Sequence, residues 1–177
     1  MFRSLAMGAV LACGTMVGAA GPAFADAEAA FFQTVAGRWI GPGEIVAGKY
    51  KGTRFNCDLS GGAKPKAVGI ALEGSCRVGL FAQPMKAEVT RGKGGYSGAF
   101  LDGAAGAGLD IVAGAFDGQK MVFTLDRKQL NGAMVARLEG DDALQVTISV
   151  RVGTDLVPVI GMTLAREGEA VRQTALD

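Results

Sequence analysis

The sequence contains no histidine, although it is 177 residues long. Histidine is the commonest general base, the usual partner of a catalytic serine or cysteine, and a frequent ligand of transition metals. Its absence excludes the hydrolases that depend on a histidine base and most transition-metal sites. The remaining side chains do not bring a nucleophile together with a base. We therefore expect a protein that is not an enzyme and that holds no metal ion or other cofactor.

The sequence also has almost no excess of charge of either sign. It contains 18 basic and 17 acidic residues, and one basic residue, Arg3, lies in a segment that we expect to be removed. The remaining chain then carries 17 residues of each sign, so its net charge is zero. A chain without net positive charge has no overall electrostatic attraction for nucleic acid or for anionic membranes. We expect no binding of nucleic acid and no stable membrane insertion after processing.

The longest stretch without charge follows Arg3 at the start of the chain. It runs from Ser4 to Ala20 in small and apolar residues, and continues through Gly21-Pro22 to Ala23-Phe24-Ala25. A basic head, an apolar run and small residues before the cut are typical of a cleavable signal peptide. We therefore predict that residues 1–25 are a cleaved signal peptide. Residues 26–177 would form one domain, exported to the periplasm or the extracellular space.

Two alternatives for this leader stay open. Ser4–Ala20 is 17 residues long, near the lower limit of roughly 17–25 residues for a membrane-spanning helix. A lipoprotein cut before Cys13 is a second alternative, because Val10-Leu11-Ala12-Cys13 loosely matches the required pattern. The many small residues and the site after Ala25 favour cleavage there.

Cysteine is scarce, with three in the chain, and processing would leave Cys57 and Cys76. An even number of cysteines in an exported domain is most simply explained by a disulfide. Closing a loop of about twenty residues would contribute on the order of 3 kcal/mol. Two free thiols or a catalytic pair are the alternatives. A tight turn near Lys64 would place Cys57 opposite Ala71, so the disulfide needs either a longer connection or a β-bulge.

Apolar and polar residues alternate with a period of two along much of the chain, which predicts β-strands with one dry and one wet face. The clearest run is Leu144–Val152, and Met121–Leu125 and Val68–Leu72 follow the same pattern. The dipeptides Asp117-Gly118 and Asn131-Gly132 favour two-residue hairpin turns. Less specific breaks are expected at 60–65, 91–95, 102–108 and 140–142.

These breaks divide the chain into about ten strands, preceded by a short helix over Asp26–Val35 with Asp26 as its cap. Short connections throughout predict an all-β fold, an up-and-down antiparallel β-barrel that closes on itself to remove its edges. The predicted strands are 38–46, 50–58, 67–78, 84–91, 95–102, 107–116, 119–126, 132–139, 143–152 and 156–166.

Amphipathic aromatic residues are few. An outer-membrane barrel needs an apolar outer band with aromatic girdles, whereas the processed chain has only Trp39, Tyr50 and Tyr96 and ends in the polar tail Gly168–Asp177. The sequence therefore favours a soluble barrel.

The segment Ala36-Gly37-Arg38-Trp39 opens the first strand and resembles the Gly-x-Trp start of the calycin superfamily. That superfamily includes lipocalins, fatty-acid-binding proteins and nitrobindin-like barrels. The resemblance implies that Trp39 closes one end of the barrel and that Arg166, from the last strand, packs across its ring. Such a cation–π contact contributes about 0.5–2 kcal/mol. Nitrobindin-like barrels hold haem through a histidine, so haem ligation of that kind is excluded here.

A closed barrel of about ten strands, rich in glycine and alanine, encloses more volume than its side chains fill. We therefore expect the barrel to bind a small hydrophobic molecule in its interior, the alternative being a solid core. The candidate ligand-binding residues are Trp39, Ile45, Phe55, Phe100, Ile111, Phe123, Ile148 and Arg166.

A second hypothesis is a secreted protease inhibitor or protein-interaction module. The chain resembles the small bacterial metalloprotease inhibitors of calycin-like fold, which carry one early disulfide, although those barrels are shorter. In that case the segment Asp26–Ala36 would enter the protease cleft. Three other features are expected to be structural: the acidic turn Asp141-Asp142, the glycine-rich connection Arg91–Gly95, and Glu44 at the end of a strand.

Overall fold

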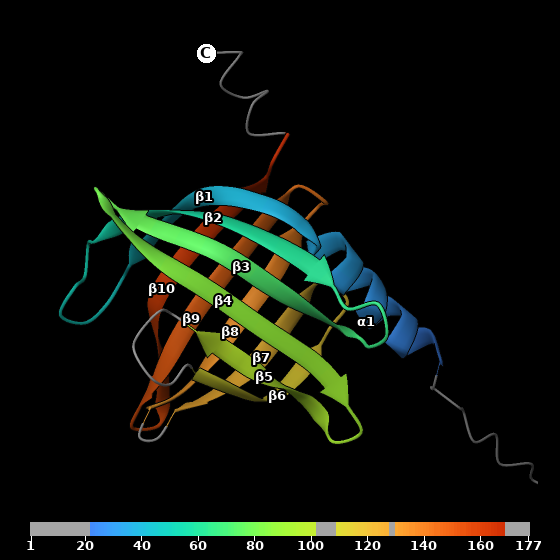
Figure 1. Ribbon diagram of the computed structural model, residues 1–177. Helices are drawn as coiled ribbons and strands as arrows, with labels where there is room; N and C mark the ends of the chain where they lie inside the picture. The colour runs from blue at the N-terminus through green and yellow to red at the C-terminus, as the bar shows by residue number, and fades with distance from the viewer. Residues whose placement is uncertain (1–21, 102–108, 128–129, 169–177) are drawn as a thin grey trace, which may run out of the picture.

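The computed structural model describes residues 22–101, 109–127 and 130–168. Ten antiparallel strands form a closed barrel in which each strand pairs with its neighbours in the chain and β1 pairs with β10. One helix precedes the first strand (Figure 1). The elements are α1 (Pro22–Val35), β1 (Gly37–Ile45), β2 (Arg54–Ala63), β3 (Gly69–Val78), β4 (Phe81–Gly92), β5 (Gly95–Leu101), β6 (Leu109–Phe116), β7 (Lys120–Arg127), β8 (Leu130–Glu139), β9 (Ala143–Val152) and β10 (Asp155–Arg166).

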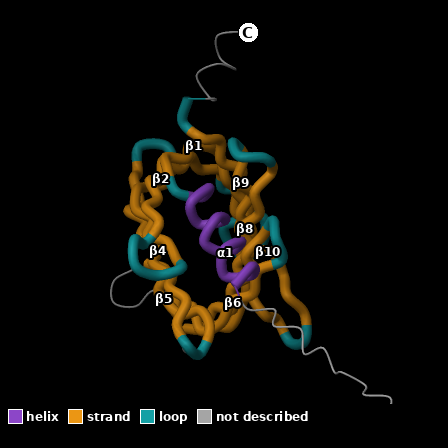
Figure 2. Tube along the Cα trace, turned by 90° about the vertical axis from the view of Figure 1, so that its right-hand side faces the viewer, coloured by secondary structure: helices purple, strands orange, loops and turns teal. Residues whose placement is uncertain are grey.

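The up-and-down path of the chain gives the barrel two different ends. Helix α1 lies at one of them, which we call the plugged end, and Figure 2 shows α1 lying across the ring of strands. At the opposite end, which we call the mouth, β1, β3, β5, β7 and β9 end and β2, β4, β6, β8 and β10 begin. Figure 1 shows the β1–β2 loop projecting at the end of the barrel away from α1.

The closed antiparallel barrel confirms the predicted fold class, and alternation explains which face of each strand points inward. In β9, Leu144, Val146 and Ile148 are buried and Gln145 is exposed. The same residues pair across β10, where Leu144 lies opposite Leu164. Each strand therefore contributes an apolar row to the interior and a more polar row to the outside.

One predicted hairpin turn is confirmed and another is wrong. Asp117-Gly118 forms a turn in which Gly118 has a φ of 88°. Asn131-Gly132 instead lies inside β8, and Gly132 is opposite Val150. A Cβ atom on Gly132 would lie 2.2 Å from the carbonyl oxygen of Ser149. This glycine therefore allows two strands to approach closely and does not form a turn.

The second strand is also displaced from its predicted range of 50–58. It begins at Arg54 and runs to Ala63, because Tyr50–Thr53 belongs to the β1–β2 turn and the expected break at 60–65 starts too early. The connection to β3 is Lys64–Val68. The break expected at 102–108 lies outside the described residues.

Helix α1 begins at Pro22, four residues before the predicted start. Proline suits the first turn of a helix because its missing N–H would have no partner there. Asp26 therefore lies inside the helix, and its assignment as the cap was wrong. Of the predicted signal peptide, only its last four residues lie in the described part of the chain, where they form the first turn of α1. No helix in the described segments is long and apolar enough to cross a membrane.

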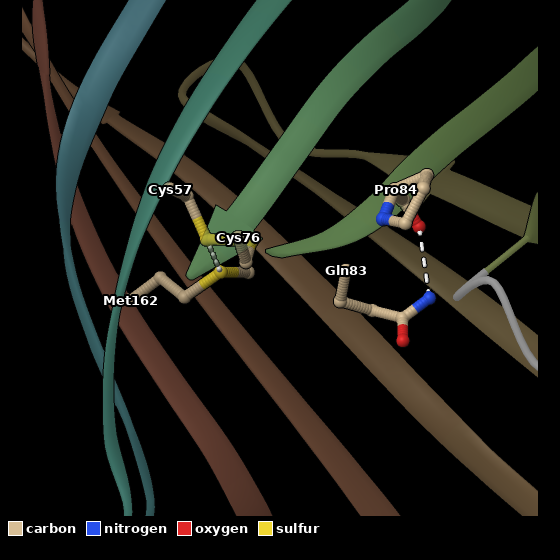
Figure 3. Close-up of a disulfide and its surroundings, with 5 residues drawn as sticks. All are labelled: Cys57, Cys76, Gln83, Pro84 and Met162. Carbon is tan, nitrogen blue, oxygen red and sulfur yellow. Dashed lines mark hydrogen bonds between the residues drawn. A yellow bond between two sulfur atoms is a disulfide. The ribbon is translucent and has the colours of Figure 1, made fainter. Parts of the chain in front are cut away.

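The predicted disulfide is present between Cys57 and Cys76, which face each other directly across β2 and β3 with Cα atoms 4.0 Å apart (Figure 3). The pairing of β2 with β3 contains no register shift. The five-residue connection Lys64–Val68, and not a bulge, therefore aligns the two cysteines. Both side chains are buried on the inner face of the barrel.

Candidate ligand-binding cavity

The mouth half of the barrel encloses an apolar cavity of about 360 Å³, which we call the outer chamber. Ligand pockets in proteins measure roughly 300–1,000 Å³, so this volume is at the lower end of the usual range. The chamber reaches the rim of the barrel, because Val78 and Leu130 line it and remain 43% and 42% exposed. Its deeper wall is formed by Ile45, Phe55, Met85, Phe100, Leu125, Ile148, Val159, Ile160 and Met162.

A smaller cavity of about 90 Å³, the inner chamber, lies between the outer chamber and α1. Phe31, Phe32 and Val35 of the helix form one of its walls, and the strands form the others. Four residues line both chambers and so mark the neck between them: Cys76, Met85, Phe100 and Met162.

Two of the four neck residues, Met85 and Met162, have flexible side chains. A Cβ atom on Gly43 would lie 2.2 Å from the ring of Phe55 and 2.8 Å from Met162, so this glycine leaves room for both side chains. Methionine is unbranched and polarisable, and it fills irregular spaces without a fixed shape. Met162 also lies beside the disulfide, with its sulfur 3.8 Å from that of Cys57 (Figure 3). The two methionines therefore give the neck the least rigid part of its wall.

The polar groups that reach the cavity surface lie toward its mouth. The inner chamber is lined by apolar surface, whereas Gln83, Arg127 and Ser149 line the outer chamber. Arg127 is the last residue of β7, so its charge lies at the rim and not in the depth of the barrel. Ligand pockets commonly combine an apolar wall with a few polar groups that fix orientation. This cavity therefore suits a molecule with an apolar body and at most one polar end, which would point outward.

The plugged end is closed by the residues that the sequence singled out. Trp39 is completely buried, and its indole N–H donates to the carbonyl oxygen of Val35 at 2.8 Å. The Arg166 guanidinium stacks on the indole, 4.4 Å from the ring centroid. Arg166 also donates hydrogen bonds to the carbonyl oxygens of Thr34, Ala36 and Asp141. One side chain thus ties together α1, the start of β1 and the β8–β9 turn.

A second polar contact holds the helix from the opposite side. Glu28 is buried in α1 and forms an ion pair with Arg91 near the end of β4. Tyr96, which lies opposite Arg91 on β5, is buried, and its hydroxyl has no hydrogen-bond partner among the described residues. Burial, and then the negative charge of Glu28, raise the pKa of the Tyr96 phenol. Both effects favour the neutral form of the phenol.

The structure brings seven of the eight candidate residues to the cavity. Phe100 lines both chambers, and Arg166 lines neither, because it lies against Trp39. The residues of the inner chamber are Trp39, Phe100, Ile111 and Phe123, and those of the outer chamber are Ile45, Phe55, Phe100 and Ile148.

Several lining residues were not predicted from the sequence, above all Met85, Met134 and Met162. Met134 lies opposite Phe123 on one side and Ile148 on the other. Both neighbours were predicted to point inward, so the strand register would have identified Met134. That register was not accessible while Asn131-Gly132 was assigned to a turn.

The other features weighed in the sequence lie outside the cavity. Glu44 is half exposed and lies 3.6 Å from Arg54. Asp141-Asp142 forms the exposed turn between β8 and β9, and Lys93-Gly94 joins β4 to β5. Among the described residues, no cluster of three or more acidic or cysteine side chains is arranged to hold a metal ion.

Comparison with known proteins leaves the cavity as the main guide to function. No family model matches the chain, and no curated protein matches its sequence.

Proposed function

We propose that this protein is an exported, non-enzymatic binding protein that holds a small hydrophobic molecule inside its barrel. The observation that carries the proposal is the apolar outer chamber of about 360 Å³, which reaches the rim of the barrel. A cavity of this size leaves apolar surface in contact with water, and burying apolar surface contributes about 25 cal/mol per Å². A hydrophobic ligand would remove that exposed surface.

The distribution of polarity supports a particular kind of ligand. The walls become entirely apolar toward the plugged end, whereas Gln83 and Arg127 lie at the mouth. A molecule with an apolar chain or ring system and one polar group, such as a fatty acid, would place the apolar part in the chambers. Its polar group would remain at the mouth, within reach of water and of these two side chains.

Two further observations support export and a non-inserted state. The Cys57–Cys76 disulfide is of the kind that persists in an oxidising compartment. The outward-facing residues of β9 include Gln145, Thr147 and Arg151, a polar face that suits contact with water and not with lipid chains.

The protease-inhibitor alternative requires Asp26–Ala36 to leave the barrel and enter a protease. In the structure Phe31, Phe32 and Val35 are buried, and Arg166 donates hydrogen bonds to the backbone of Thr34 and Ala36. Extracting the segment would break these contacts. No described feature favours the inhibitor function, so we prefer the carrier.

The proposal is tested with the neutral fluorescent probe N-phenylnaphthylamine. We expect saturable binding by the purified protein and displacement of the probe by oleic acid. Ile148→Trp should weaken binding at least tenfold, because Ile148 lines the outer chamber and the larger ring would occupy it. Mass spectrometry of the protein isolated with its natural ligand would then identify the molecule.

A matched control separates filling of the cavity from damage to the strand. Thr147→Trp introduces the same side chain at the neighbouring position, where it points to the outside of β9, and it should leave probe binding unchanged. If the wild-type protein binds no probe, or if both variants weaken binding equally, the carrier proposal is wrong.

A further inference from the structure

We propose that the mouth of the barrel is a docking surface for an anionic lipid bilayer, and that the ligand passes between the bilayer and the outer chamber. The inference rests on the proposed function, but it is carried by different residues. Its basis is the set of large exposed apolar side chains, which are concentrated around one end of the barrel, together with the basic side chains that lie beside them.

Large hydrophobic side chains are exposed almost exclusively at the mouth. In the described chain, all but Val112 belong to the mouth connections or to the strand ends beside them. The most exposed pair is Leu80 and Phe81, at 97% and 83% exposure, in the β3–β4 hairpin. Val78 completes this hairpin at the rim of the outer chamber. A leucine at the outermost point of a turn contributes nothing to the core of the protein.

Other described parts of the mouth repeat the pattern. Val46 and Tyr50 are exposed in the β1–β2 loop, and Val152 and Leu156 are exposed in the β9–β10 hairpin. Leu130 adds a further side chain at the start of β8. These positions form a ring of separate apolar tips around the cavity opening, and not one continuous patch on the side of the barrel.

The connections at the plugged end provide an internal comparison. They are Lys64–Val68, Lys93-Gly94, Asp117–Gln119 and Gly140–Asp142, and none of them exposes a large hydrophobic side chain. Both sets of connections join neighbouring strands of one barrel. The apolar ring is therefore a property of the mouth and not a general consequence of the fold.

Basic side chains accompany the apolar tips. Lys49 and Lys51 flank Tyr50, with the Lys49 ammonium 5.5 Å from the centre of the Tyr50 ring. Arg77 precedes Val78, and Arg151 precedes Val152.

With Arg54 and Arg127 this gives six cations around the described mouth, against four anions, Glu44, Asp110, Asp126 and Asp155. The net charge of zero expected for the processed chain therefore conceals a basic mouth.

This combination fits an anionic bilayer better than it fits another protein. Apolar side chains that project beyond a ring of cations can enter the headgroup region while the cations meet lipid phosphates. A protein partner would more commonly bind one continuous patch with an apolar centre. Docking would also place the outer chamber directly against the lipid, so that a hydrophobic ligand would not have to cross water.

The test measures sedimentation of the full protein with vesicles. Vesicles of phosphatidylcholine mixed with phosphatidylglycerol should bind the protein, and binding should weaken with added salt. Each basic residue near an anionic surface contributes about fivefold to affinity. The double substitution Lys49→Glu and Lys51→Glu should therefore weaken binding by at least about 25-fold, whereas Lys66→Glu with Lys93→Glu, at the plugged end, should have little effect.

A second variant tests the apolar contribution. Leu80→Ser with Phe81→Ser should weaken vesicle binding by about tenfold or more. Val112→Ser, which removes an exposed valine away from the mouth, should not. Both serine variants should retain the wild-type urea midpoint, because the side chains they replace are exposed.

The outcomes separate the two proposals. The docking surface is overturned if the protein does not bind vesicles. It is also overturned if the Lys49 and Lys51 variant binds them as well as the Lys66 and Lys93 variant does. Either result counts even if N-phenylnaphthylamine still binds in the cavity. A wild-type protein that self-associates but binds no vesicles, and a Leu80 and Phe81 variant that no longer self-associates, would identify a contact between two copies of the chain. This result would also overturn the docking surface for a bilayer. Vesicle binding without binding of the probe would overturn the carrier function and leave the docking surface standing.

Discussion

Replacing Arg166 by methionine tests how the plugged end is held together. The substitution keeps an apolar stem but removes the guanidinium, which stacks on Trp39 and donates to three carbonyl oxygens. The cation–π contact contributes about 0.5–2 kcal/mol, and each hydrogen bond about 0.5–1.5 kcal/mol net. The low ends of these ranges already give about 2 kcal/mol, and we expect a loss of about 2–4 kcal/mol.

The assay uses the fluorescence of Trp39, which is the only tryptophan in the chain and is completely buried. With a urea slope of about 2 kcal/mol per molar, the middle of the usual range, the unfolding midpoint of Arg166→Met falls by about 1–2 M. Arg38→Met is the control, because Arg38 lies next to Trp39 in β1 but its ion pairs with Asp58 and Glu167 are exposed. An unchanged midpoint for Arg166→Met, or an equal loss in both variants, would refute the role assigned to Arg166.

Two further predictions concern the disulfide and the dependence of stability on pH. Cys57→Ala with Cys76→Ala should lower the free energy of unfolding by about 3 kcal/mol; reductant should lower the urea midpoint of the wild type but not of this variant. Hydrogen bonding to Arg38 lowers the pKa of Asp58, and Lys64 and Lys120 act similarly on Glu88 and Asp117. A carboxyl group whose pKa is lower in the folded state stabilises the fold above its ordinary pKa and loses this effect as the pH falls. Urea midpoints should therefore fall between about pH 5 and about pH 3. They should fall less in Asp58→Asn, and an equal fall would contradict the pKa assignment.

The closed barrel and its inward-facing residues were predictable because alternation depends only on local sequence. In β9 the predicted range, 143–152, agrees with the structure at both ends. The Trp39–Arg166 contact was also predicted, although only through a resemblance, and the structure contains it. Neither prediction required knowledge of how far each strand slides against its neighbour.

Register was the property that the sequence did not determine. A turn at Asn131-Gly132 would have paired Phe123 with Gly140, whereas the structure pairs it with Met134. The sequence alone does not distinguish a glycine in a turn from a glycine in a strand. A turn requires glycine for its positive φ, whereas a strand can require it where another backbone approaches closely. Met134 was missed for this reason, since its partners across the sheet depend on the register of β8.

The basic, apolar mouth was missed for a different reason. The net charge of the chain does not show where its charged residues lie. The alternating pattern of the strands identifies the residues that face the interior, and not those at the rim. Leu80 and Phe81 were not singled out, because single exposed apolar residues are common on protein surfaces. Only the closed barrel shows that such residues from different hairpins surround one opening.

The structure divides stability and binding between the two ends of the barrel, and this division is testable. Arg166 does not line either chamber, and Ile148 lines the outer one. Substitutions at separate sites without shared partners usually act additively. Arg166→Met should therefore lower the urea midpoint and leave the affinity for N-phenylnaphthylamine within about twofold of wild type. Ile148→Trp should weaken binding of the probe and leave the urea midpoint near that of the wild type. The double variant should show both the lower midpoint and the weaker binding. If Arg166→Met also abolishes probe binding in the folded protein, the plugged end shapes the binding site. The inner chamber would then be part of that binding site.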